Sequence, residues 1–188
     1  MVELTQGNLL QADVEALVNT VNCVGVMGKG IALQFKQAFP ENFRAYETAC
    51  RAGSVEPGRV LVVPLDRIDG PRFILNFPTK RHWRQPSRLE DIRTGLQSLV
   101  AEIRRLGIRS VAVPPLGCGN GGLQWREVRP LIEQAFAEAP DVLVRLYPPL
   151  GAPPPAEMPV GTTPPRWTRA RAMLVRLVDL YCQEDHYL

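Results

Sequence analysis

The sequence predicts an α/β fold in which a largely parallel β-sheet lies between two layers of helices. Strand-like and helix-like segments alternate along residues 1–147, which is typical of such three-layer α/β/α sandwiches. Three glycine-bearing loops each follow an apolar, strand-like run. With 188 residues, of which 45% are hydrophobic, the chain is long enough for one well-cored domain and a short appendage.

The expected elements fall into two sets. The expected strands are Val2–Thr5, Ala16–Asn19, Val60–Pro64, Phe73–Phe77, Ser110–Val113 and Val142–Leu146. The expected helices are Gly30–Phe39, Glu41–Ala52, Leu89–Leu106 and Gln124–Ala137. We expect these elements to form a single domain over residues 1–147.

Composition changes sharply after this domain. Proline is frequent in residues 148–166, which predicts a linker without regular structure. Residues 167–188 resume helical spacing, with apolar side chains at Met173, Leu174, Leu177, Val178 and Tyr181. A lone amphipathic helix needs a partner, so this segment is expected either to open a second domain or to dock on the first.

The cysteines and histidines limit the chemistry that we expect. Cys23, Cys50, Cys118 and Cys182 form no C-x-x-C pair and no metal-binding spacing, so we expect reduced thiols and a cytoplasmic protein. No apolar run approaches the roughly 20 residues of a membrane span. With His82 and His186 as the only histidines, a histidine-rich metal site is excluded, and neither a metal nor a cofactor is expected.

The three loops are Thr5–Leu10, Asn19–Ala32 and Pro114–Leu123. The last two lead into predicted helices, so their backbone N–H groups can close around an anion beside the positive end of a helix dipole. A phosphate-bearing nucleotide is the expected ligand.

These loops partly match two known nucleotide-binding patterns, the P-loop and the dinucleotide-binding G-x-G-x-x-G motif. A P-loop requires glycine and Ser or Thr at positions where this chain has Cys23 and Gly30, so that interpretation fails. Residues Gly117–Gly122 satisfy G-x-G-x-x-G between a strand and a helix, but they follow the fifth expected strand, and the pattern alone is weak evidence for a dinucleotide site.

Together the loops resemble those of the macrodomain family, whose members bind ADP-ribose. The similarity covers residues 1–147 and depends on QGNLL, on DVEALVNTVNCVGVMGKGIALQF, and on PPLGCGNGGLQW. The motifs MGKGIA, FPTKR and LGCGNGGLQW are similar to the branch with terminal ADP-ribose protein glycohydrolase and a bacterial DNA ADP-ribosyl glycohydrolase antitoxin. The resemblance implies a mixed, largely parallel sheet and the removal of ADP-ribose from a macromolecule.

The resemblance also implies roles for individual residues. The adenine end would be lined by Asn8, Leu9 and Leu10, with Asn8 in place of the family's usual aspartate. The distal ribose would contact Asn22, and the ribose and a phosphate would be wrapped by Met27, Gly28, Lys29, Gly30, Ile31 and Ala32. The pyrophosphate would be covered by Gly117, Cys118, Gly119, Asn120, Gly121, Gly122 and Leu123. Asn19 ends an expected strand, and both a turn-capping and a ligand-binding role are open to it.

Lys80 is the catalytic residue that the resemblance implies. In the similar glycohydrolases a lysine at this position attacks the anomeric carbon of the distal ribose, which requires a neutral amine. Neighbouring cations, here Arg81 and Arg84, or a desolvated pocket can lower a lysine pKa enough to supply it. The protein-acting relative also uses a loop aspartate, and Gly121 takes that place here. The missing acid could be unnecessary, could be replaced by His82 or water, or could leave Lys80 a purely electrostatic role.

The segment from Lys80 to Arg88 is basic and carries no acidic residue. We expect Arg81, Arg84 and Arg88 to hold phosphates and the rings of His82 and Trp83 to contact bases, as on single-stranded nucleic acid surfaces. An ordinary solvated loop is the alternative.

The combined prediction is a hydrolase that removes ADP-ribose from thymidine in single-stranded DNA and counteracts an ADP-ribosyltransferase toxin. Its partners would be ADP-ribose, the modified DNA and a cognate toxin, with no membrane involved. The toxin contact is expected after Trp167. A non-catalytic ADP-ribose reader and a glycohydrolase acting on modified protein are the alternatives.

Overall fold

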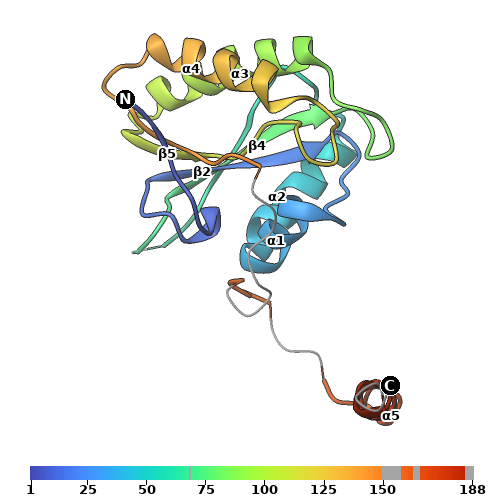
Figure 1. Ribbon diagram of the computed structural model, residues 1–188. Coiled ribbons are helices and arrows are strands. Elements are labelled where there is room, and N and C mark those ends of the chain that lie inside the picture. The colour runs from blue at the N-terminus through green and yellow to red at the C-terminus, as the bar shows by residue number, and fades with distance from the viewer. Residues whose placement is uncertain (68, 150–157, 163–165, 185–188) are drawn as a thin grey trace.

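The computed structural model describes residues 1–67, 69–149, 158–162 and 166–184 (Figure 1). Its strands are β1 (Val2–Leu4), β2 (Ala16–Asn22), β3 (Leu61–Pro64), β4 (Phe73–Lys80), β5 (Ser110–Val113) and β6 (Leu143–Leu146). Its helices are the 3₁₀ turn η1 (Leu9–Gln11), α1 (Gly30–Ala38), α2 (Pro40–Arg51), α3 (Leu89–Arg105), α4 (Trp125–Ala137) and α5 (Arg169–Glu184). Each expected strand and helix is present, with ends that differ by a few residues.

The strands form one sheet in the order β1-β6-β5-β2-β4-β3. Neighbouring strands are parallel except for β3, which runs antiparallel to β4. The predicted mixed, largely parallel sheet is therefore confirmed. Because β1, β2, β4, β5 and β6 all run the same way, the loops after them emerge at one edge of the sheet.

Helices α3 and α4 cover one face of the sheet, and α1 and α2 cover the other (Figure 1). On the first face, α3 packs closely on β4: a Cβ at Gly95 would lie 2.3 Å from the Phe77 ring. This near contact explains a glycine inside a helix, where it otherwise costs stability. The predicted three-layer architecture is confirmed.

Strands β2 and β4 extend three residues further than expected, to Asn22 and Lys80. Proline argues against a central strand, but Pro78 lies beyond Asn76, the last β4 residue that pairs with β3, so its missing N–H disrupts no bond to β3. The β2–β4 register shifts after Val21, and Asn22 then pairs with Lys80. The two predicted site residues thus end neighbouring strands side by side.

Asn19 occupies a different place from the one expected. It lies within β2 rather than at its end, has no exposed surface, and donates from Nδ2 to Asn76 Oδ1 at 2.9 Å. Asn76 in turn donates to Asn42 Oδ1 at 2.7 Å, which links β2 and β4 to α2. Asn19 therefore has a buried position inside the strand, and its Oδ1 has no hydrogen-bond partner among the described residues.

Beyond the domain, the described part of the linker returns to the C-terminal end of α1. The Gly161 N–H donates to Gln37 O at 2.7 Å, and a Cβ at Gly161 would lie only 2.5 Å from Ala38 O. Helix α5 begins at Arg169, two residues later than expected, and residues 185–188 lie outside the described part of the chain. The described side chains of α5 are exposed, and the division into domain, linker and helix stays a prediction.

None of the described helices is long and apolar enough to span a membrane. Cys23, Cys50 and Cys118 are free thiols, whereas the side chain of Cys182 lies outside the described residues.

Candidate functional site

A cleft with a volume of about 760 Å³ lies at the sheet edge where the parallel strands end. Loops after all five parallel strands contribute to it: residues 5–9 after β1, 26 and 28–32 after β2, 83–84 after β4, 114, 115, 117 and 119–121 after β5, and 147–149 after β6. Ligands of open α/β sheets bind outside the carboxyl ends of the strands, and this cleft occupies that place.

Most of the predicted site residues line the cleft. They are Asn8, Leu9, Asn22, Gly28, Lys29, Gly30, Ile31, Ala32, Lys80, Trp83, Arg84, Gly117, Gly119, Asn120 and Gly121. The others do not line it: Leu10, Asn19, Met27, Arg81, His82, Arg88, Cys118, Gly122 and Leu123. Leu10 and Met27 were expected to contact the ligand, but both are buried in apolar clusters beneath the loops.

One end of the cleft is apolar. Leu9 and Tyr147 line it and belong to one buried cluster, against which Ile31 packs. Burial raises the pKa of the Tyr147 phenol. Asn8 starts η1 by accepting the Leu10 N–H at 3.0 Å, so part of its amide capacity serves the loop. This end suits a flat, largely apolar group such as a nucleobase.

The N-terminus of α1 opens into the cleft. Gly30 is its first residue, and Lys29 before it provides no side-chain cap. The N–H groups of the first turn therefore keep their hydrogen-bonding capacity beside the positive end of the helix dipole. The cleft lining from the glycine-rich loop stops at Gly121, before α4 begins at Trp125, so the corresponding role of the α4 N-terminus stays a prediction.

Asn22 lines the cleft and also shapes the loop that follows it. Its Oδ1 accepts the N–H groups of Val24 at 3.0 Å and Val26 at 3.3 Å, and its Nδ2 donates to Val26 O at 2.5 Å. The Tyr46 hydroxyl lies 2.8 Å from Asn22 O. The expectation that Asn22 lies beyond the strand is wrong, since it is the last residue of β2.

Lys80 ends β4 and extends its side chain across the cleft to the glycine-rich loop. Its ammonium group donates to the backbone carbonyl of Asn120. Partial burial lowers the pKa of this amine, so the cause of the shift is desolvation and not the neighbouring arginines.

The glycine-rich loop packs tightly on Ser87. The Ser87 N–H donates to Gly121 O at 2.9 Å. A Cβ at Gly121 would lie 2.2 Å from Gly117 O and 2.3 Å from Ser87 Oγ, so no side chain fits there. The loop thus excludes an aspartate at the place where the protein-acting relative uses one. The Ser87 hydroxyl is buried and has no hydrogen-bond partner among the described residues.

The charged side chains among the described residues of the cleft lining are Lys29, Lys80 and Arg84, and none is acidic. This balance suits a pyrophosphate and excludes a pair of catalytic carboxylates. Within the described residues, no three His, Cys, Asp or Glu side chains gather closely enough to hold a metal ion.

The basic segment divides into two parts. Arg81 is bound bidentately by Asp91 of α3, with Nη1–Oδ2 and Nη2–Oδ1 distances of 2.5 and 3.0 Å, so its charge is already neutralised. Trp83, by contrast, is 46% exposed at the cleft. The His82 ring stacks on the Trp83 ring with 5.4 Å between the ring centroids, and the Arg84 guanidinium lies 4.5 Å from the centroid of the Trp83 ring. The expected phosphate contact at Arg81 is therefore disfavoured, whereas Trp83 and Arg84 form an accessible stacked pair.

The lining residues that were not assigned to the site from the sequence are Thr5, Gln6, Gly7, Thr20, Val21, Val26, Gln34, Thr79, Pro114, Pro115, Tyr147, Pro148 and Pro149. Gln34 lies one helical turn after Gly30, so helical periodicity could have identified it. Tyr147 directly follows β6, and the rule that sites form at the carboxyl ends of parallel strands could have identified it.

Comparison with known proteins agrees with this geometry. Over 181 residues the chain is 52% identical to a DNA ADP-ribosyl glycohydrolase of Thermus aquaticus, a match that covers 96% of this chain and 50% of the relative. The chain thus spans about half the length of the curated relatives it matches.

Solved structures are similar as well. The macrodomain of Mycobacterium tuberculosis DarG superposes with a TM-score of 0.79 at 58% identity, covering 79% of this chain and 98% of that one. Thermosipho africanus DarTG in complex with ADP-ribose gives a TM-score of 0.74 at 32% identity, covering 84% and 44% of the two chains. The Macro domain model matches residues 18–132, and the chain therefore belongs to the Macro domain family.

Proposed function

We propose that this chain is a glycohydrolase domain that removes ADP-ribose from nucleobases of single-stranded DNA, with thymidine as the modified nucleoside. The observation that carries the proposal is the lysine amine at the polar end of the cleft. Lys80 has a lowered pKa, lies beside Asn22 in the strand register, and reaches the glycine-rich loop. The relatives named as DNA ADP-ribosyl glycohydrolases and the complex of a similar protein with ADP-ribose support it.

The cleft suggests an orientation for ADP-ribose. Adenine would lie at the apolar end near Leu9 and Tyr147, and the pyrophosphate would lie between the α1 N-terminus and the glycine-rich loop. The distal ribose would then lie at the polar end, near Asn22 and Lys80. In this orientation the anomeric carbon, which carries the nucleobase, faces the amine.

The proposed reaction has two steps. The neutral Nζ of Lys80 attacks the anomeric carbon, the bond to the base nitrogen breaks, and the electron pair of that bond leaves with the base. Water then hydrolyses the enzyme–ADP-ribose adduct, which returns the amine and releases ADP-ribose. The thymine base, which remains part of the DNA strand, leaves the ribose as an imide anion and takes its proton from water. This substrate therefore requires no general acid.

This leaving group is consistent with the cleft. A glutamate or aspartate ester of ADP-ribose would be expected to use the loop aspartate of the protein-acting relative, but Gly121 has no room for one. His82, the other proton donor considered, does not line the cleft, and its Nδ1 accepts the Arg84 N–H at 3.3 Å. These two observations leave the leaving group without a loop carboxylic acid or His82 as proton donor, and the nucleobase-linked substrate is proposed from the relatives named as DNA ADP-ribosyl glycohydrolases.

DNA would approach across Trp83 and Arg84. An exposed indole beside a guanidinium offers base stacking and a phosphate contact in one place. Trp83→Ala is expected to weaken single-strand binding by about 1–3 kcal/mol, the usual value of one base–aromatic stack. Arg84→Glu is expected to reduce the salt dependence of binding. Unchanged affinity and salt slope in both variants would remove DNA binding from this surface.

The antitoxin role and a cytoplasmic location belong to the same proposal. They rest on the resemblance to the antitoxin branch and on the free thiols of Cys23, Cys50 and Cys118. The exposed apolar side chains of α5 are where a toxin contact is proposed.

The substrate is tested by a direct comparison. Wild-type protein is given a single-stranded oligonucleotide carrying ADP-ribose on thymidine and, separately, a protein carrying ADP-ribose on glutamate, and released ADP-ribose is measured. We expect release from the oligonucleotide and at most slow release from the protein. Release from the protein alone would favour a protein-acting glycohydrolase, and tight ADP-ribose binding with no release from either would favour a reader.

A further inference from the structure

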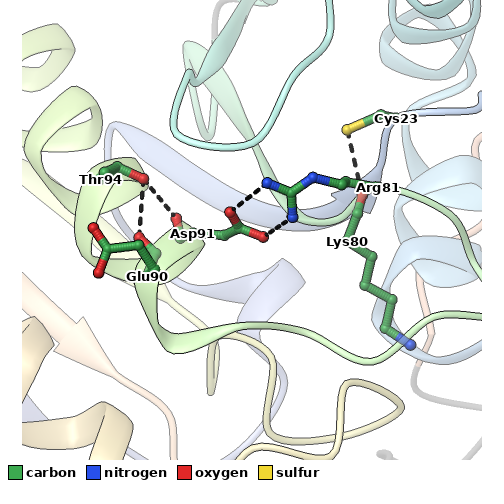
Figure 2. A network of polar contacts seen from close by, with 6 residues as sticks. All are labelled: Cys23, Lys80, Arg81, Glu90, Asp91 and Thr94. Atoms are coloured by element: carbon green, nitrogen blue, oxygen red, sulfur yellow. Dashed lines mark hydrogen bonds and ion pairs between the residues drawn. The ribbon is translucent and has the colours of Figure 1, made fainter.

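The end of β4 that carries Lys80 is held by a network that does not line the cleft. Figure 2 shows its main members, with the Lys80 side chain leaving the strand in one direction and the Arg81 guanidinium reaching Asp91 in another. Neither Cys23 nor Asp91 lines the cleft, and neither is needed to bind ADP-ribose in the orientation proposed above.

Cys23 holds the backbone carbonyls of Lys80 and of the next residue, Arg81. Its thiol donates to Lys80 O at 3.3 Å, and its N–H donates to Arg81 O, also at 3.3 Å. Burial raises the pKa of this thiol to about 11, so it carries the proton that the hydrogen bond requires. The contact lies directly after the register shift at Val21 and the last pair of the β2–β4 ladder, Asn22 with Lys80.

Asp91 fixes the same strand end from the other side. It lies in the first turn of α3, its side chain is only 10% exposed, and both its oxygens bind Arg81. The Thr94 hydroxyl donates to Glu90 O at 3.0 Å and lies 3.4 Å from Asp91 O, which braces this turn (Figure 2). A bidentate pair with one partner buried restricts orientation more than an exposed pair does.

We infer that Cys23 and Asp91 are positioning residues for Lys80: Cys23 acts on the strand backbone, and Asp91 acts through Arg81. Together they direct the Lys80 amine toward the polar end of the cleft. The inference rests on the proposed function, in which this amine attacks the anomeric carbon. It also gives a role to the pairing of Arg81 with Asp91, which engages the arginine next to the nucleophile although its side chain is 46% exposed.

The inference is tested with free ADP-ribose and no nucleic acid. The open-chain aldehyde of the distal ribose condenses with a neutral lysine amine, which forms a C=N bond and releases water. Borohydride, added as the reductant, delivers hydride to that bond and leaves a stable secondary amine. Peptide mass spectrometry then measures the adduct at Lys80, while calorimetry measures ADP-ribose affinity.

The variants are Asp91→Asn, Cys23→Ala and Cys23→Ser. Misplacement of a reacting group by about 1 Å can cost about 100-fold in rate, so Asp91→Asn is expected to lower the trapping rate by about tenfold or more while affinity changes by less than about threefold. Cys23→Ala is expected to lower trapping less, and Cys23→Ser to restore part of it because the hydroxyl still donates.

The matched control is Glu102→Gln, which breaks an exposed ion pair with Arg105 on the same helix. This variant should form the Lys80 adduct at the wild-type rate. If Asp91→Asn does not fold, Arg81→Gln removes the other partner and is expected to give the same selective loss. Wild-type trapping in both Asp91→Asn and Cys23→Ala, or a loss of affinity that parallels the loss of trapping, would overturn the positioning role. Absence of an adduct in the wild type would overturn the lysine chemistry of the proposed function as well.

Discussion

The two glycine-bearing walls of the cleft keep their shapes by different means. The loop after β2 is held by side-chain hydrogen bonds, because the Asn22 amide binds the backbone of Val24 and Val26. The loop after β5 is held by close packing of backbone, because Gly117 and Gly121 lie against Ser87. At the first wall glycine leaves the backbone open to a ligand. At the second wall glycine is needed because there is no space for a side chain.

The largest effect is expected from Gly121→Asp at the second wall. A new side chain would collide with Gly117 O and Ser87 Oγ. Forced overpacking costs about 1–3 kcal/mol, which corresponds to about 5- to 150-fold weaker ADP-ribose binding if the loop must move. Calorimetry with ADP-ribose measures the effect. Wild-type affinity, or gained activity on modified glutamate, would show that this wall tolerates a carboxylate.

A smaller loss is expected from Asn22→Ala at the first wall. The substitution leaves the Val24 and Val26 backbone groups without their partner, at a cost of about 1–3 kcal/mol shared between stability and binding. Thermal unfolding and ADP-ribose calorimetry measure the two parts. Asn22→Asp is the matched control, because it keeps the acceptor oxygen and should retain more of both. Equal losses in the two variants would contradict a role for Oδ1 in shaping the loop.

The pH dependence tests the residue that joins the two walls. Lys80 acts as a neutral amine in the proposed reaction, and burial lowers its pKa. The rate of ADP-ribose release should therefore rise with pH, by at most about tenfold per unit, and level off below the ordinary lysine value of about 10.4. A rate that falls with pH over this range, or one that does not change, would contradict a nucleophilic amine.

The smallest effect is expected from Ser87→Ala. The hydroxyl has no hydrogen-bond partner among the described residues, so its removal should leave the free energy of unfolding unchanged or raise it by up to about 1 kcal/mol. Denaturant unfolding is the measurement. Ser87→Thr should destabilise the protein because the extra methyl group enters a packed site. A clear loss in Ser87→Ala would mean that a hydrogen bond, and not shape, holds this wall.

Much of the fold could be predicted because it depends on local patterns. The alternation of strands and helices predicted the three layers, and the glycine-bearing loops predicted two walls of the cleft. The ends of β2 and β4 could not be predicted, because Pro78 argues against a strand that has a paired neighbour on each side. The neighbour on the β3 side stops at Asn76, and that fact is visible only in the folded structure.

The site was harder to predict wherever contacts join distant residues. The pairing of Arg81 with Asp91 and the packing of Ser87 on Gly121 depend on how α3 approaches the strand ends. Asn19 and Asn22 look alike in the sequence, yet one lies in the core and the other at the cleft. Their difference follows from the length of β2, which places Asn19 inside the strand and Asn22 at its end.

The most direct test of this account is release of ADP-ribose from a thymidine-modified single-stranded oligonucleotide by the wild type, by Lys80→Ala and by Lys36→Ala. Lys36, on α1, does not line the cleft and serves as the matched lysine control. We predict that release is lost in Lys80→Ala alone, while calorimetry finds ADP-ribose binding in all three proteins. Unchanged release by Lys80→Ala would contradict the account.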